Sequence, residues 1–456
     1  MSDNFKTDTL DSLCELIVDC PHSTPTWTTF GYVVIRNQNI TDGVLDLSSP
    51  SYTDYSGYRD RTKRASPQEN DIVITREAPM GRVCLIPKEP ICCLGQRQVL
   101  LRADRNKISS EYLYWSLRSP FVQRQILINE GTGATVSNMR IPVLKALEIP
   151  RLASIEIENK KARDLSNIQN KIQLNTQINQ TLEQIAQALF KSWFVDFDPV
   201  RAKVQALSDG LSLEQAELAA MQAISGKTPE ELTALSQTQP DRYAELAEIA
   251  KEFPCEMVEV DGVEVPKGWE VKELGSLMTI KRGGSPRPIK DFISDKGLNW
   301  VKISDATAED NPFLFSTKEY IKSEGLSKTV LLKKGSLILS NSATSGLPRF
   351  LELDACIHDG WLYFSNIKRL TQEYLYFFFL NIRNNLIAQG NGSVFTNLKT
   401  DIVKAQKTIV PDEKIMYYFD SQIKSIMNLI RYKTANSISL KETRDLLLPE
   451  LLNGGV

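Results

Sequence analysis

The sequence predicts an α+β fold in which two similar domains are separated by two long antiparallel helices that form a coiled coil with pseudo-twofold symmetry. Three observations lead to this fold class. Four sequence blocks recur in the same order in the two halves of the 456-residue chain. Within each half, short strand-like runs alternate with turn residues. After each half comes a long stretch whose apolar residues recur at helical spacing.

The recurring blocks pair residues of the first half with residues of the second. They are YVVIRNQNI (32–40) with WVKISDATA (300–308), NDIVIT (70–75) with GSLILS (335–340), EYLYWSLRS (111–119) with EYLYFFFLN (373–381), and GTGATVSNMR (131–140) with GNGSVFTNLK (390–399). One such match could arise by chance. Four matches in one order indicate that a single unit was duplicated.

Each copy is expected to form a small α+β domain, the first over 1–152 and the second over 265–410. Strands are predicted at Tyr32–Ile35, Asp71–Ile74, Trp300–Ile303 and Ser336–Leu339, where β-branched and aromatic residues lie between turn residues. An aromatic-rich helix is predicted over 109–128 and again over 371–388. The Gly-rich blocks at 131 and 390 are interpreted as tight turns in which Asn138 and Asn397 cap the local backbone.

A long helix is predicted after each domain, over 153–198 and 411–448, with a tail over 449–456. A helix of about 40 residues would be about 60 Å long. The first apolar stripe passes through Asn175 and Asn179, which would fix the register of a helix pair. Asp412 and Glu413 suit a helix start, and Pro449 suits its end. The stripe residues are Leu165, Ile168, Ile172, Leu182, Ala186 and Leu189 in the first helix, and Met416, Phe419, Ile423, Ile426, Ile430, Leu440 and Leu447 in the second.

The segment 199–264 is predicted to be an acidic helical linker. Residues 201–264 hold 5 basic and 13 acidic side chains, so the rest of the chain carries a net charge of +6 against −2 for the whole. The whole-chain charge therefore does not exclude a nucleic-acid partner. The linker could space the domains, meet a protein partner, or be a solvated connection.

Composition excludes several classes of protein. Hydrophobic residues make up 42% of the chain and charged residues 24%, which is typical of a globular protein. No apolar run is long enough to cross a membrane and the amino terminus does not resemble a signal peptide, so we expect a cytoplasmic protein. The odd count of 7 cysteines predicts free thiols, and with only His22 and His358 as histidines no metal site is expected.

Three segments resemble the specificity subunit of type I restriction-modification enzymes: NQTLEQIAQALFKSWFVDFDPV (179–200), DIVITREAPMGRV (71–83) and LLLPELLNGGV (446–456). The resemblance implies that each domain reads one half of a bipartite site in double-stranded DNA and that the helices set the spacer. It also implies docking to two modification subunits, which bind S-adenosylmethionine, and to restriction subunits that use ATP and Mg²⁺. No cofactor is expected on this chain.

The sequence also lacks the marks of catalysis. There is no tetrapeptide that begins Asn-Pro-Pro or Asp-Pro-Pro, as in an amino-methyltransferase, and neither histidine is flanked by a nucleophile elbow. SGKTPEE at 225–231 ends like a phosphate-binding loop, but Met221 replaces the first glycine, so Thr228 and Pro229 are expected to open a helix. The alternatives are a stand-alone DNA-modifying enzyme and a duplicated protein-interaction scaffold.

Loop residues that can pair with base edges or phosphates are the candidates for DNA contact. In the first domain they are Arg36, Asn37, Gln38, Arg59, Arg61, Lys63, Arg64, Arg76 and Arg82. In the second they are Lys281, Arg282, Arg287, Lys302, Ser304, Asn341, Ser342 and Thr344. For any one of them the alternative is a solvated surface side chain.

Overall fold

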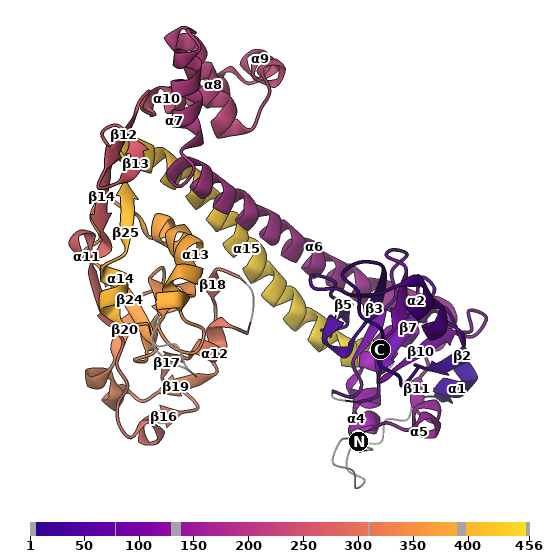
Figure 1. The fold of residues 1–456 in the computed structure, drawn as a ribbon. Coiled ribbons are helices and arrows are strands. Elements are labelled where there is room, and N and C mark those ends of the chain that lie inside the picture. The colour runs from indigo at the N-terminus through magenta and orange to yellow at the C-terminus, as the bar shows by residue number, and fades with distance from the viewer. Residues whose placement is uncertain (1–5, 78, 129–137, 309–310, 390–397, 453–456) are drawn as a thin grey trace. The chain divides into compact units, whose positions relative to one another are not determined.

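The computed structural model describes residues 6–77, 79–128, 138–308, 311–389 and 398–452 (Figure 1). The chain divides into two compact units: Met1–Leu174 with Ser437–Val456, and Asn175–Asn436. Each unit therefore contains one α+β domain and part of both long helices. The Gly-rich blocks at 131 and 390 fall mostly outside the described residues, as does Asn397.

The domain of the first unit is built on two small sheets. The larger has the antiparallel order β2 (Cys14–Asp19), β10 (Gln98–Ala103), β7 (Ile72–Thr75), β8 (Val83–Leu85). The smaller has the order β6 (Ser51–Thr53), β3 (Tyr32–Ile35), β9 (Cys92–Leu94), with β3 and β9 parallel. Two further pairs are β1 (Thr7–Thr9) with β11 (Glu148–Pro150) and β4 (Ile40–Thr41) with β5 (Val44–Leu45).

Short helices cover this domain: α1 (Leu10–Leu13), α2 (Tyr55–Arg61), α3 (Ser110–Arg118), α4 (Pro120–Ile128), α5 (Ile141–Lys145) and the 3-10 turn η1 (Asn37–Asn39). The prediction of a single helix over 109–128 is wrong, because the helix is interrupted at Ser119, between α3 and α4. Ser119 is extended, with ψ 148°, as expected before a proline. Its hydroxyl accepts a hydrogen bond from the N–H of Val122.

The domain of the second unit has two five-stranded sheets. One has the order β15 (Thr279–Arg282), β24 (Trp361–Ser365), β21 (Leu337–Ser340), β22 (Pro348–Leu351), β18 (Phe313–Leu314). The other has the order β16 (Ile293–Ser294), β19 (Glu319–Ile321), β17 (Leu298–Val301), β23 (Ala355–Ile357), β20 (Val330–Leu332). The remaining elements are β14 (Glu270–Glu273) paired with β25 (Lys407–Val410), α11 (Leu274–Leu277), η3 (Ile289–Asp291), α12 (Ile303–Ala306), η4 (Ser323–Lys328), α13 (Gln372–Gln389) and α14 (Thr400–Lys404).

The two domains share one topology, which confirms the duplication. The order β2-β10-β7-β8 recurs as β15-β24-β21-β22, and the parallel pair β3-β9 recurs as β17-β23. The first and last strands of each domain pair antiparallel, β1 with β11 and β14 with β25. Three of the recurring sequence blocks lie on equivalent elements: β3 and β17, β7 and β21, α3 and α13.

The predicted linker forms a helical segment of the second unit. It contains α7 (Asp198–Ser208), α8 (Leu213–Ser225), α9 (Pro229–Thr238), α10 (Pro240–Glu252) and the hairpin β12 (Met257–Val260)–β13 (Val263–Pro266). Thr228 caps α9 by accepting a hydrogen bond from the N–H of Glu231, so the prediction that Thr228 and Pro229 open a helix is confirmed. Lys203 is buried and donates to the carbonyls of Ala250 and Phe253 at the end of α10.

The long helices are α6 (Ile155–Phe194) and α15 (Glu413–Leu452), each of 40 residues. Within the second unit they pack antiparallel, since Asn175 bonds Asn436 while the Phe190 ring contacts the Phe419 ring. The predicted stripes are buried or half-buried along both helices. They bury apolar surface that neither helix could bury alone.

The two ends of α15 differ in how they match the prediction. Asp412 caps the start, where its carboxylate accepts a hydrogen bond from the N–H of Lys414 at 3.0 Å. The predicted end at Pro449 is wrong, because the helix continues through that proline to Leu452. A proline in the last turn removes only the bond to the carbonyl of Asp445. Asp445 is exposed, so water can satisfy that carbonyl.

Candidate nucleic-acid interface

Two of the candidate arginines in the first domain are internal supports. Arg61, at the end of α2, is 6% exposed and donates to the carbonyls of Leu94, Gly95, Pro21 and Ser23 at 2.6 to 3.2 Å. Burial lowers the pKa of its guanidinium. Because its donors are occupied by backbone carbonyls inside the domain, Arg61 is not available to DNA, contrary to the sequence-based prediction.

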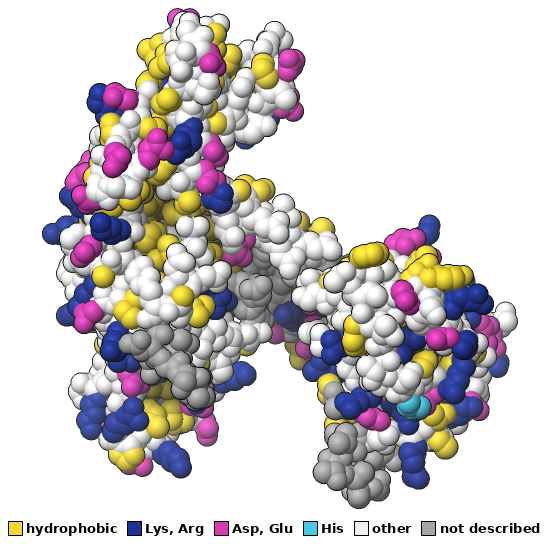
Figure 2. All heavy atoms as spheres, viewed as in Figure 1, with side chains coloured by type: hydrophobic (Ala, Val, Ile, Leu, Met, Phe, Trp, Pro, Cys, Tyr) yellow, Lys and Arg dark blue, Asp and Glu magenta, His cyan; other side chains and the backbone are white. Residues whose placement is uncertain are grey.

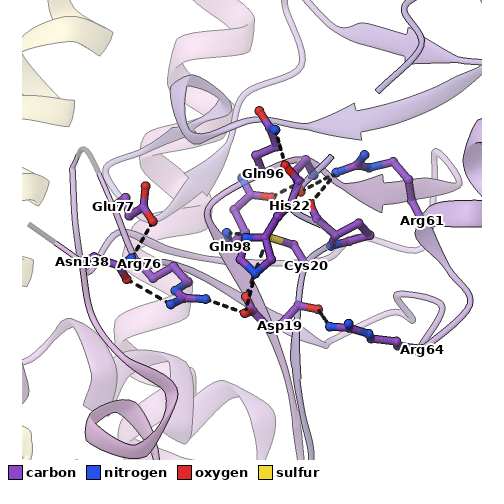
Figure 3. A network of polar contacts seen from close by, with 12 residues as sticks. Asp19, Cys20, His22, Arg61, Arg64, Arg76, Glu77, Gln96, Gln98 and Asn138 are labelled. Carbon is purple, nitrogen blue, oxygen red and sulfur yellow. Dashed lines mark hydrogen bonds and ion pairs between the residues drawn. The ribbon is translucent and has the colours of Figure 1, made fainter. Parts of the chain in front are cut away.

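Arg76 lies directly after β7 and belongs to the network of polar contacts drawn in Figure 3. It is 8% exposed and bonds Asp19 at 2.5 Å and Asn138 at 3.0 Å. Asn138 in turn donates to Glu77 at 2.8 Å. Asn138 therefore joins two side chains instead of only capping local backbone, and Arg76 ties β2 to the chain after the Gly-rich block.

The second domain repeats this arrangement with a different side chain. Asn341 follows β21 as Arg76 follows β7, and its carbonyl accepts from the N–H of Leu398 at 2.8 Å. In the first domain the carbonyl of Arg76 accepts from the N–H of Met139 at 2.9 Å. The duplicated fold thus holds the same backbone contact in both copies, while the residue at this position differs.

The other candidates of the first domain lie at or near the surface. Arg36 stacks over the Trp27 ring, with 5.3 Å from the guanidinium carbon to the ring centroid, and Arg59 lies 5.9 Å from the centroid of Tyr55. Gln38, Lys63, Arg64 and Arg82 are also exposed. Asn37 is half-buried and donates to the carbonyl of Glu77 at 2.6 Å.

Sequence reasoning missed two exposed rings of the first domain, Trp27 and Phe30, whereas Tyr55 lies in the segment 51–64 whose tyrosines alternate with basic residues. Trp27 is 45% exposed, Phe30 80% and Tyr55 60%. Exposed rings next to arginine are suited to contact with bases and sugars, because ring faces and guanidinium planes stack. The signal in the sequence was PTWTTF at 25–30, whose aromatics lie among threonines without an alternating apolar partner.

In the second domain the candidates gather around Asp359. Its carboxylate accepts from Ser285 at 2.7 Å and from Arg287 at 3.3 Å, and its carbonyl accepts from Arg282 and Asn341, each at 3.2 Å. The hydrogen bond from Ser285 lowers the pKa of Asp359. Three loops, over 282–287, 341–344 and 358–360, are thereby held together.

The remaining candidates of this domain differ in exposure. Asn341 is fully buried, so we assign it to loop support and not to DNA contact. Lys302 pairs with Glu319. Lys281 and Ser304 are exposed, whereas Ser342 and Thr344 are half-buried in the loop after β21.

On the face seen in Figure 2, positive charge is distributed and not concentrated. Figure 2 shows Lys and Arg interspersed with Asp and Glu over the described residues that face the viewer. Strong nonspecific attraction to phosphate needs a concentrated basic surface. The face seen in this view instead favours recognition through local groups of side chains.

Among the described helices none is long and apolar enough to span a membrane.

These features define a class of protein: two copies of one α+β binding module, each continuing into a 40-residue helix. Residues 3–184 and 266–439 match the family described as the type I restriction modification DNA specificity domain. The chain belongs to this family, and its role is the recognition of DNA sequence.

Known relatives agree with this assignment. The chain is 42% identical over 381 residues to the HindI specificity subunit of Haemophilus influenzae, covering 78% of this chain and 80% of the relative. It is 23% identical to the MjaIX specificity subunit of Methanocaldococcus jannaschii, covering 90% and 84%. The crystal structure of a type I S subunit from M. genitalium shares the fold, with a TM-score of 0.54, 16% identity and coverage of 98% and 96%.

Proposed function

We propose that each α+β domain reads one half of a bipartite DNA site and that α6 and α15 set the number of base pairs between the halves. The observation that carries this proposal is the duplicated topology with unlike side chains at equivalent loops. A shared scaffold with the exposed Arg36 in one copy and the exposed Ser304 at the aligned position of the other suits two half-sites of different sequence.

The contact residues of this proposal are those that the structure leaves accessible. In the first domain they are Arg36, Gln38, Arg59, Lys63, Arg64 and Arg82, joined by Trp27, Phe30 and Tyr55. In the second they are Lys281, Arg282, Arg287, Lys302, Ser304, Ser342 and Thr344. The arginines and lysines would bind phosphates and so position each domain on the duplex. Gln38 and the hydroxyls of the serines and Thr344 can pair with base edges.

We further propose that this chain supplies specificity and leaves the chemistry to partners, in the cytoplasm. Two modification subunits with S-adenosylmethionine would methylate the site, and restriction subunits with ATP and Mg²⁺ would act on unmodified DNA. The names of the relatives as specificity subunits of restriction enzymes support this division.

Methylome sequencing of a host that carries the complete system tests the proposal. We expect methylation at one bipartite motif with a fixed spacer, lost when the gene for this chain is deleted. Purified chain alone should neither methylate nor cut DNA. Methylation or cleavage by the chain alone would favour a stand-alone enzyme, and a methylome unaffected by the deletion would favour a protein-interaction scaffold.

A further inference from the structure

An ion pair joins the first domain to α15 within the first unit. Asp42 lies in the turn between β4 and β5 and accepts from Arg444 of α15 at 2.8 Å. Arg444 is only 4% exposed and also donates to Gln169 of α6 at 2.6 Å. One guanidinium therefore holds a domain loop and both long helices.

The turn that carries Asp42 is itself tightly seated. Arg118 of α3 donates to the other carboxylate oxygen of Asp42 at 2.9 Å, and Tyr114 donates to the carbonyl of Gly43 at 2.9 Å. A Cβ atom on Gly43 would lie 2.4 Å from both of these side chains, so only glycine fits. The loop cannot shift without breaking these contacts.

A second ion pair joins the other domain to α15 within the second unit. Glu352, directly after β22, has a side chain that is 2% exposed, and its Oε1 lies 2.8 Å from Nε of Arg431. The Nζ atom of Lys334 lies 3.1 Å from Oε2 of Glu352. The Arg431 guanidinium also lies over the Phe313 ring, 5.1 Å from its centroid.

The two pairs are not copies produced by the duplication. The offset of 259 that aligns the repeated blocks places Ile185 and Ile172 of α6 opposite Arg444 and Arg431. Because α6 has isoleucine at both aligned positions, only α15 supplies an arginine there. Each arginine forms an ion pair with an acidic residue in a loop of a recognition domain. The side chains of Arg444 and Glu352 are buried, whereas those of their partners Asp42 and Arg431 are each 40% exposed. Intermediate orientations are disfavoured, because moving the loop would leave the buried charge of each pair without this partner.

We infer that Arg444 and Arg431 are positioning residues that hold each recognition domain in one orientation on α15 and thereby sharpen the discrimination of spacer length. This inference rests on the proposed reading of two half-sites. Neither arginine reads a base in this scheme. Their loss would let the domains rock on the helices, so that half-sites one base pair nearer or farther would be accepted.

The test uses the full complex with its modification subunits and DNA duplexes that carry the native spacer or one base pair more or fewer. Arg444→Met and Arg431→Met remove the charge and keep the apolar stem. We expect the preference for the native spacer to fall roughly five- to tenfold, as for coupled contacting groups. Penalties for base changes within either half-site should stay unchanged. Arg163→Met, at an exposed position of α6, is the control and should keep the native preference.

Further variants separate positioning from simple destabilisation. Arg444→Lys and Arg431→Lys retain the charge and should restore part of the spacer preference. If a Met variant fails to fold, Asp42→Asn and Glu352→Gln break the same pairs from the acidic side and should relax the spacer equally. Unchanged spacer preference in folded variants would overturn the inference. A wild-type complex without any spacer preference would instead contradict the proposed function.

Discussion

At the scale of single residues, one residue type serves two purposes in the first domain. Arg36 and Arg59 lie on the surface beside aromatic rings, whereas Arg61 and Arg76 are buried and saturated or nearly so by protein acceptors. The sequence around 59–64 cannot separate these roles, because Arg61 is distinguished only by carbonyls that lie more than 30 residues away along the chain. Tertiary contacts decide which arginine is buried.

Arg61→Met should therefore lower the stability of the first domain without resembling a surface change. Four carbonyls would lose their donor inside the domain, at an expected cost of about 2–4 kcal/mol in the free energy of unfolding. Urea denaturation measures this cost. Arg59→Met, at an exposed position, is the matched control, for which a change within about 0.5 kcal/mol is expected. Equal effects of the two substitutions would show that Arg61 is not a support.

His358 should make the second domain less stable in acid. Burial lowers the pKa of His358, and its Nδ1 accepts a hydrogen bond from the N–H of Gly360 at 2.7 Å. The folded state thus favours the neutral ring, so its contribution is present above the ordinary histidine pKa of about 6.5 and is lost as pH falls through the lower folded value.

The measurement is the unfolding midpoint at pH 8 and pH 5. His358→Asn keeps an acceptor near the position of Nδ1 but cannot be protonated, so it should lose less stability than wild type over this interval. His22→Asn, at a side chain that is 68% exposed, is the control. A variant with the same pH dependence as wild type would show that His358 does not titrate on unfolding.

At the scale of elements, periodicity predicted the fold well where one face of an element is buried. The duplicated strands and the two 40-residue helices follow from apolar spacing, which directly reflects burial. The points at which helices are interrupted or end were harder to predict. Pro120 divides a helix pattern into α3 and α4, yet Pro449 lies inside α15. Proline thus interrupts the helix at one position, and it is tolerated at the other, where only one hydrogen bond of the last turn is lost.

The helix pair contains a polar layer in the second unit whose members should act together. Asn175 donates to Asn436 at 3.0 Å, and Asn179 donates to Thr434 at 3.0 Å. Asn175→Leu or Asn436→Leu alone would leave a polar partner facing an apolar group. The double variant should be more stable than the sum of the single effects predicts, with a coupling of about 1–2 kcal/mol.

A double-mutant cycle in urea measures this coupling. Leu174→Ala at a neighbouring exposed position is the control and should combine additively with Asn436→Leu. Additivity between Asn175 and Asn436 would mean that the hydrogen bond contributes nothing to the pairing of α6 with α15.

At the scale of the whole molecule, the helices should act as a ruler for the DNA spacer. Inserting four residues into α6 beside Asn175 and four into α15 beside Asn436 would lengthen each helix by about 6 Å. At about 3.4 Å per base pair, the preferred spacer should grow by one or two base pairs. Methylome sequencing of the altered system reads the new spacer. An unchanged spacer would show that the helices do not set it.

The proposed DNA contacts are the part of the site that sequence predicted least. Loop composition marked candidate segments, but burial in the structure removed Asn37, Arg61, Arg76 and Asn341 from the proposed contacts, and exposure added Trp27 and Phe30. The exposure of a loop side chain depends on backbone groups that are distant along the chain and on side-chain packing, and a local sequence pattern predicts neither.

Domain exchange tests the central claim most directly, namely that each domain reads its own half-site. Residues 265–410 of this chain would be replaced by the corresponding domain of a relative with a different known motif, and the methylome of the resulting system would be sequenced. The account predicts a hybrid motif in which one half-site is replaced and the other half-site is retained. A motif changed in both halves, or in neither, would contradict it.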